Sequence, residues 1–223
     1  MTYLTEMAES TDSYASIWYI EGAEEPILVD AGGSAATMRK RGFQAEHIAS
    51  PDEALGKFGL TPQDIGLVIC THLHNDHMEL GQFYPNARFI IQQAELEANS
   101  HPHPLEAPRC VSQERLQGID FHPITGDYQV ADGLKIISTP GHTRGGQSVV
   151  VHTQAGEAVI SGLCTLDENF HPKGNMKSTM PVIPPGIHLD VREAFDSMMK
   201  IKMIADIIIP LHDPSFALQS SIP

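Results

Sequence analysis

The sequence has few cysteines and no long apolar run. The three cysteines, Cys70, Cys110 and Cys164, are odd in number and far apart, which argues against a disulfide framework and fits a reducing compartment. No segment approaches the roughly 18 consecutive apolar residues of a membrane-spanning helix. Residues 1–6 combine neither a basic nor an apolar region, so the sequence predicts no secretory signal and a cytoplasmic protein.

Basic side chains are also scarce. The 14 Lys and Arg residues face 28 Asp and Glu residues, which gives a formal net charge of −14. Such a charge repels the phosphate backbone of nucleic acids and anionic membrane surfaces. We therefore expect neither nucleic acid nor a membrane as a partner.

The length and composition predict one globular domain over residues 1–223. Hydrophobic residues make up 41% of the chain, which is ordinary for a globular protein and enough for a sizeable core. The sequence contains no internal repeat and no low-complexity linker. A single core can therefore accommodate the whole chain.

Short apolar segments separated by turn residues predict a strand-rich chain with few helices. Strands are expected at residues 14–20, 26–30, 65–70, 87–92, 134–139, 148–151, 158–161 and 207–210. Helices are expected at residues 34–42, 51–58, 94–99 and 190–204. The helix at 190–204 carries apolar residues at helical spacing, so one of its faces is buried.

A dense group of polar side chains, Thr71–His77, directly follows the expected strand at 65–70. Side chains two apart on extended backbone point the same way, so His72 and His74 can reach one metal ion together. Asp76 and His77 follow where the chain turns, and can face a second ion a few ångströms away. The alternative is a polar surface turn, which rarely contains so many potential ligands.

Two further histidines, His142 and His212, also follow expected strands. Such recurrence is what a metal site assembled at one edge of a sheet requires. His101 and His103 are each followed by proline, which favours an exposed loop. Asp30 ends another expected strand, where it either braces the metal loop or only initiates a turn.

In this set of residues the chain resembles the metallo-β-lactamase superfamily, whose pattern is HxHxDH, a lone His, an Asp or Cys, and a final His. The segments most similar to the N-acyl-homoserine lactonase branch are residues 126–130, 138–143, 146–148 and 168–170. The resemblance extends from about residue 27 to residue 213. It implies an α/β fold, a four-layer αβ/βα sandwich with metals at one edge.

The resemblance also implies two divalent metal ions, for which zinc is the natural choice and iron or manganese the alternatives. The first ion would be held by His72, His74 and His142. The second would be held by Asp76, His77 and His212. A metal-bound hydroxide, oriented by Asp76 as a catalytic residue, would attack a carbonyl group.

One departure from the family pattern lies about twenty residues after His142, where a bridging Asp is expected. Gly162 or Leu163 occupies that position, and Cys164 follows. Cys164 is either a ligand of the second metal or a buried structural cysteine. The lactonase branch carries a Tyr near this point, where Thr165 stands here. We expect Thr165 to contact substrate, together with Phe170 in the segment 170–188 that would cover the site.

These observations predict a metal-dependent hydrolase that opens a small lactone or ester-like carbonyl substrate. A thioester or amide hydrolase is the nearest alternative, because the same hydroxide serves each reaction. The missing bridging Asp leaves open a non-catalytic metal-binding sensor on the same scaffold. A homodimer is the general expectation for a soluble enzyme.

Overall fold

The computed structural model describes residues 13–174, 179–217, 221 and 222. In this part of the chain the strands form two five-stranded sheets. The first sheet contains, in spatial order, β1 (Trp18–Ile20), β2 (Ile27–Val29), β3 (Leu67–Ile69), β4 (Arg88–Gln92) and β5 (Asp120–Ile124). β1 and β2 form an antiparallel hairpin, and β2 to β5 are parallel to one another.

The second sheet is mostly antiparallel. Its spatial order is β10 (Ile207–Ile209), β9 (Gly156–Ile160), β8 (Gln147–Thr153), β7 (Leu134–Ser138) and β6 (Tyr128–Ala131). Only β9 and β10 pair in parallel. The long helix that precedes β10 makes this parallel return possible.

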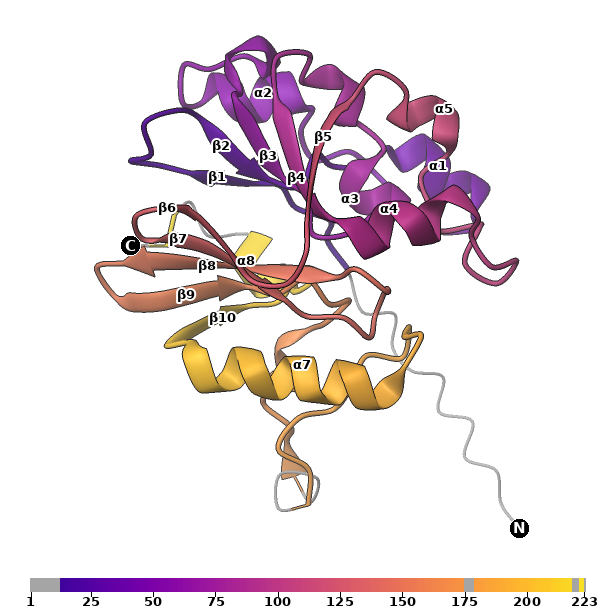
Figure 1. Cartoon of the computed structure of the whole chain (residues 1–223), viewed down its shortest axis with the longest axis vertical. Coiled ribbons are helices and arrows are strands. Elements are labelled where there is room, and N and C mark those ends of the chain that lie inside the picture. Colours follow the sequence, from indigo (N-terminus) through magenta and orange to yellow (C-terminus); the bar gives the residue numbers. More distant parts are fainter. Residues whose placement is uncertain (1–12, 175–178, 218–220, 223) are drawn as a thin grey trace.

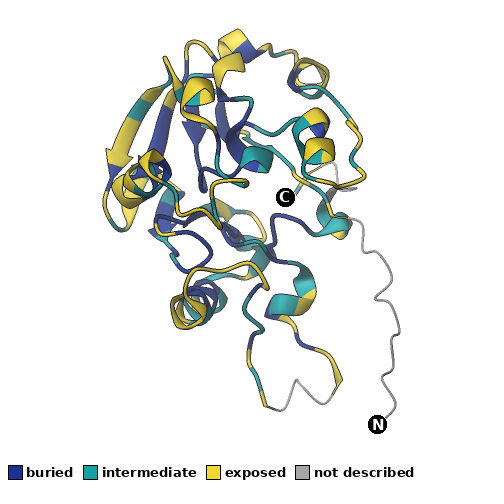
Figure 2. Ribbon diagram, turned by 90° about the vertical axis from the view of Figure 1, so that its right-hand side faces the viewer, coloured by how far each residue is buried: buried dark blue, intermediate teal, exposed yellow. Residues whose placement is uncertain are grey.

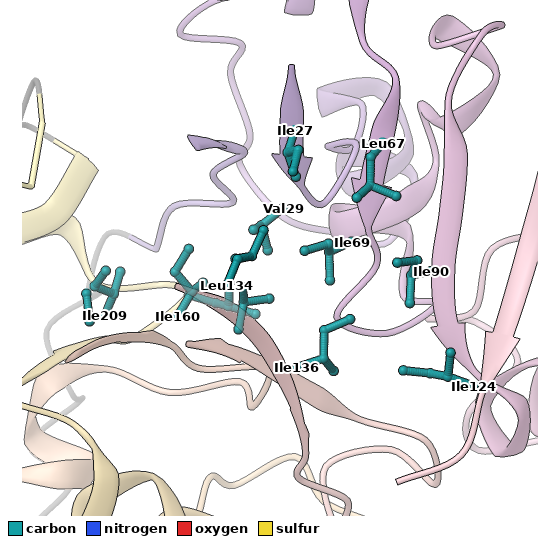
Figure 3. Close-up of a cluster of buried hydrophobic side chains, with 13 residues drawn as sticks. Ile27, Val29, Leu67, Ile69, Ile90, Ile124, Leu134, Ile136, Ile160 and Ile209 are labelled. Carbon is teal, nitrogen blue, oxygen red and sulfur yellow. The ribbon is translucent and has the colours of Figure 1, made fainter. Parts of the chain in front are cut away.

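The two sheets pack face to face around a central core, part of which is drawn in Figure 3. Side chains along a strand alternate between its faces. Ile27 and Val29 therefore belong to the core between the sheets, whereas Leu28 between them belongs to a second core on the helix side. Because both faces of these strands are covered, they read as continuous apolar runs in the sequence.

Helices cover the outer face of each sheet (Figure 1). Those of the first half of the chain are α1 (Ala35–Lys40), α2 (Pro51–Gly56), α3 (Asn75–Met78), α4 (Gln93–Ser100) and α5 (Gln113–Leu116), with 3-10 turns at Pro62–Asp64 and Gly81–Phe83. Those of the second half are α6 (Asp167–Phe170) and α7 (Val191–Ile204). The short helix α8 (Pro214–Ala217) lies instead beside the core between the sheets, against which Phe216 packs. In Figure 2 the inner strands are buried, and exposed segments gather on helices, loops and an edge strand. The four layers confirm the predicted αβ/βα sandwich.

The largest difference from the sequence-based expectation is β5, which was not predicted. Its segment contains Pro123 and is exposed along much of its length, so it lacks the apolar run that identifies the other strands. Proline is tolerated there because β5 is an edge strand. The first strand is also shorter than the predicted 14–20, since regular pairing begins at Trp18.

None of the helices in the described ranges has the length and apolarity needed to cross a membrane.

Candidate metal centre

The predicted ligands converge because their loops leave neighbouring strand ends. The segment from His72 to His77 follows β3, His142 follows β7, and His212 follows β10. Their ligand atoms form two groups, each with all atoms within 4.8 Å of one another. The first group is His72, His74 and His142, and the second is Asp76, His77 and His212. The structure thus brings together the two sets predicted from the sequence.

The first group consists of three buried imidazoles with exposures of 0%, 6% and 2% for His72, His74 and His142. The Nε2 atoms of His72 and His142 lie 3.3 Å apart. Two nitrogens bound to one tetrahedral zinc would lie about 3.3 Å apart, given bonds of about 2.0–2.1 Å. The spacing therefore fits a shared cation.

Backbone carbonyls orient two of the rings. Nδ1 of His142 donates to the carbonyl oxygen of Ile187 at 2.7 Å, and Nδ1 of His212 donates to that of Tyr14 at 2.9 Å. A proton on Nδ1 leaves the lone pair of Nε2 free for a metal ion. These carbonyl partners could not be predicted from the sequence, because any residue supplies the same group.

Asp30, at the end of β2, connects the two groups. One carboxylate oxygen accepts from the Thr71 amide at 2.7 Å, and the other accepts from the Thr71 hydroxyl at 2.9 Å and from Nδ1 of His77 at 2.9 Å. The Thr71 hydroxyl in turn lies 3.1 Å from Nδ1 of His72. Asp30 therefore braces the metal loop, which decides between the two roles considered for it. Its positive φ of 62° is a strained conformation of the kind found at functional sites.

The second group has the donor set of a cation site. Oδ2 of Asp76 lies 3.5 Å from Nε2 of His77 and 3.8 Å from Nε2 of His212. Nε2 of His77 is buried and has no hydrogen-bond partner among the described residues. A buried nitrogen without a hydrogen-bond partner needs an explanation, and a cation bound between this nitrogen and the neighbouring carboxylate provides one. The residues of both groups thus fit divalent cations.

The electrostatics of the first group keep its rings neutral. Burial lowers the pKa of His72, His74 and His142, and the neighbouring histidines lower it further, reaching about 4 for His142. Metal ions bind the neutral imidazole. The first group is therefore in its metal-binding form at neutral pH.

The second group carries opposite charges instead. Burial raises the pKa of Asp76, but His77 and His212 outweigh it and hold that pKa well below its ordinary value. Burial lowers the pKa of His77, but Asp76 and Asp30 outweigh it and raise the pKa to about 8. A cation bound here would replace the proton of His77.

Gly162, one of the two residues that could occupy the position of the missing bridging Asp, has no room for a side chain. A Cβ atom at Gly162 would lie 1.8 Å from the carbonyl oxygen of Gln147 in β8. The Gly162 amide also donates to the hydroxyl of Ser148 at 2.8 Å. The end of β9 is thus pressed onto β8, and a carboxylate cannot replace Gly162 without moving the backbone.

Cys164 is a free, half-buried thiol outside both ligand groups found among the described residues. It nevertheless adjoins the second group. Burial lowers the pKa of His212, but a hydrogen bond with Cys164 contributes to the net rise of that pKa. A role for Cys164 as a ligand stays a prediction.

The two predicted substrate contacts are both buried. The Thr165 hydroxyl donates to the carbonyl oxygen of Leu163 at 3.2 Å. Phe170 has 0% exposure and lies in the core against α7 with Val182 and Met198. This placement gives Phe170 a packing role, and its contact with substrate stays a prediction. Part of the predicted covering segment, residues 175–178, lies outside the described residues.

Comparison with protein families identifies the chain. The metallo-beta-lactamase superfamily model matches residues 10–204. An N-acyl homoserine lactonase from a Bacillus species is 30% identical over 176 residues, which cover 74% of this chain and 67% of that protein. The human metallo-beta-lactamase domain-containing protein 1 is 28% identical over 200 residues, covering 88% of this chain and 61% of that protein.

Solved structures agree with this assignment. The crystal structure of a quorum-quenching N-acyl homoserine lactone hydrolase is 25% identical, with a TM-score of 0.72, and the match covers 94% of this chain and 84% of that one. Together with the two ligand groups, these relatives support divalent-metal binding. The chain belongs to the metallo-β-lactamase superfamily and is a lactonase-like metallo-hydrolase.

Proposed function

We propose that this protein uses two divalent cations, most favourably zinc, to hydrolyse a small lactone or ester-like carbonyl substrate. The observation that carries the proposal is the pair of ligand groups, each converging within 4.8 Å at the same edge of the sandwich. The lactonase relatives support the choice of substrate class. When bound, the cations would lower the pKa of water and polarise the carbonyl group.

The residues of the site have separate roles in this proposal. Three imidazoles hold one cation, and Asp76, His77 and His212 hold the other. Asp76 is ionised because its pKa is held low, so its carboxylate can accept a hydrogen bond from the attacking water and orient it. Asp30 keeps a proton on Nδ1 of His77, which leaves Nε2 as the atom that would bind the cation.

A panel of γ-lactones, N-acyl homoserine lactones, thioesters, amides and β-lactams, assayed with added zinc, manganese or iron, tests the substrate class. We expect the lactones to be hydrolysed fastest. The variant His142→Ala should lose at least about 100-fold in kcat/KM, because it removes one ligand of the first group. His152→Ala is the matched control, since His152 is exposed and pairs only with Glu157 in the described structure.

Equal activity of native protein and His142→Ala would contradict the proposed site. Preferential turnover of thioesters or amides would instead favour the alternative hydrolase.

The sequence also left open a non-catalytic metal-binding sensor, but the lactonase relatives favour the hydrolase. Tight binding of metal and a lactone, with no turnover of any substrate in the panel, would support the sensor instead.

A further inference from the structure

Glu95 is a buried carboxylate that the ligand groups do not include. It lies in the first turn of α4, which begins where β4 ends, at the edge of the sheet that carries the metal loop. Its exposure is only 4%. Burying a carboxylate is unfavourable in free energy unless its oxygens accept hydrogen bonds. The hydrogen-bond partners of Glu95 therefore indicate its role.

Two of those partners are backbone amides from different loops, and the side chain of Thr143 also lies against the carboxylate. One oxygen of Glu95 accepts from the Leu73 amide at 2.9 Å, and the other accepts from the Gly145 amide at 2.8 Å. Leu73 stands between His72 and His74, and Gly145 stands three residues after His142. One rigid carboxylate thus connects the loops that carry all three histidines of the first group.

Gly145 itself is shaped for this contact. A Cβ atom there would lie 2.3 Å from the backbone nitrogen of Glu95, so only glycine allows the loop to approach α4 so closely. Leu73 is held from its other side as well, because its carbonyl oxygen accepts from the Val111 amide at 2.9 Å. Both backbone groups of Leu73 are therefore fixed, which leaves the flanking histidines little freedom.

We propose that Glu95 is a positioning residue that sets the distance between the loop of His72 and His74 and the loop of His142. The inference rests on the proposed metal centre. Glu95 belongs to neither ligand group, and it acts through the two loops to which it is hydrogen-bonded. Its two oxygens must both accept, which a glutamine cannot reproduce because one of its atoms is a donor.

The test compares the native protein with Glu95→Gln and with Ile201→Val. Each metal-free protein is titrated with Co²⁺, and the dissociation constant and the visible absorption spectrum are measured beside the thermal midpoint. Ile201 is fully buried in the core between α7 and the second sheet, so its variant controls for a general loss of stability. We expect Glu95→Gln to bind Co²⁺ about 10–100-fold more weakly with an altered spectrum. Ile201→Val should keep both properties while losing thermal stability.

Native Co²⁺ affinity and a native spectrum in Glu95→Gln would overturn the inference and reduce Glu95 to a packing role. If that variant does not fold, Glu95→Asp serves instead. It keeps two acceptor oxygens but is one methylene shorter, so unchanged affinity and spectrum would again contradict the inference. Absence of Co²⁺ binding by the native protein would refute the proposed metal centre instead, so the two failures are distinguishable.

Discussion

At the scale of single residues, Asp30 is a non-ligand side chain that braces both ligand groups. It accepts hydrogen bonds from the amide and hydroxyl of Thr71 and from the ring of His77. Through Thr71 it also orients His72. One carboxylate thus fixes a ring in each of the two ligand groups.

Replacing Asp30 by Asn should weaken binding at both groups. The NH₂ group of Asn is a donor, so it cannot accept the hydrogen bonds that one carboxylate oxygen of Asp30 now accepts from Thr71 or His77. The ring of His72 or of His77 would then lose its orientation. We expect zinc affinity to fall about 10–100-fold, measured by competition with a chromophoric chelator. Asp120→Asn is the control, because Asp120 is exposed on β5; unaltered affinity in Asp30→Asn would refute the bracing role.

Gly162 allows a second prediction at this scale. Gly162→Ala places a Cβ atom against the Gln147 carbonyl oxygen, 1.8 Å away before relaxation. The resulting overpacking should lower the free energy of unfolding by about 1–3 kcal/mol in urea denaturation. Gly56→Ala, where nothing lies within 4 Å, should be neutral or stabilising. Similar stability of both variants would show that β9 has room to move.

Residue types predicted the ligands well, because imidazoles and carboxylates after strands are conspicuous in the sequence. The residues that hold them were harder to find. Glu95 lies in an ordinary helical segment, and two of its partners are backbone amides, which leave no trace in residue type. The carbonyl groups of Tyr14 and Ile187 were missed for the same reason.

At the scale of elements, apolar runs predicted the buried strands because both of their faces are covered. The signal failed where a strand is exposed, as in β5. It also failed for α3, a four-residue helix that carries Asp76 and His77. Such a short helix has too few residues for a periodic pattern, and its conformation is set by the surrounding loops.

The long helix α7 was predicted from its spacing, and Asp190 caps its start. The Asp190 carboxylate accepts from the amides of Arg192 and Glu193 at 2.8 Å and 3.1 Å. Asp190→Ala should therefore lower the free energy of unfolding by about 0.5–2 kcal/mol. Asp196→Ala, an exposed position within the same helix, provides the comparison. Urea denaturation measures both, and equal stability would argue against the cap.

At the scale of the whole molecule, the metal centre spans the two sheets. The loop after β3 belongs to the first sheet, whereas His142 and His212 follow strands of the second sheet. Each group therefore contains ligands from both sheets. A cation in either group would join the halves of the sandwich.

A homodimer, a cytoplasmic location and a single domain over 1–223 stay predictions.

Removing the metal should therefore destabilise the entire domain. A ligand that binds only the folded state stabilises it by about 2.7 kcal/mol when the free ligand concentration is a hundred times the dissociation constant. We expect a chelator to lower the thermal midpoint by several degrees, and added zinc to restore it. An unchanged midpoint, measured by calorimetry with and without chelator, would show that the cations do not link the sheets.

The metal content of the purified protein tests the central claim most directly. After reconstitution with zinc and removal of excess metal, elemental analysis should find about two ions per chain, as two three-ligand groups require. His142→Ala and His212→Ala should each retain about one, because each removes a ligand from a different group. A native chain that binds no zinc, or variants that bind as much as the native chain, would contradict the account.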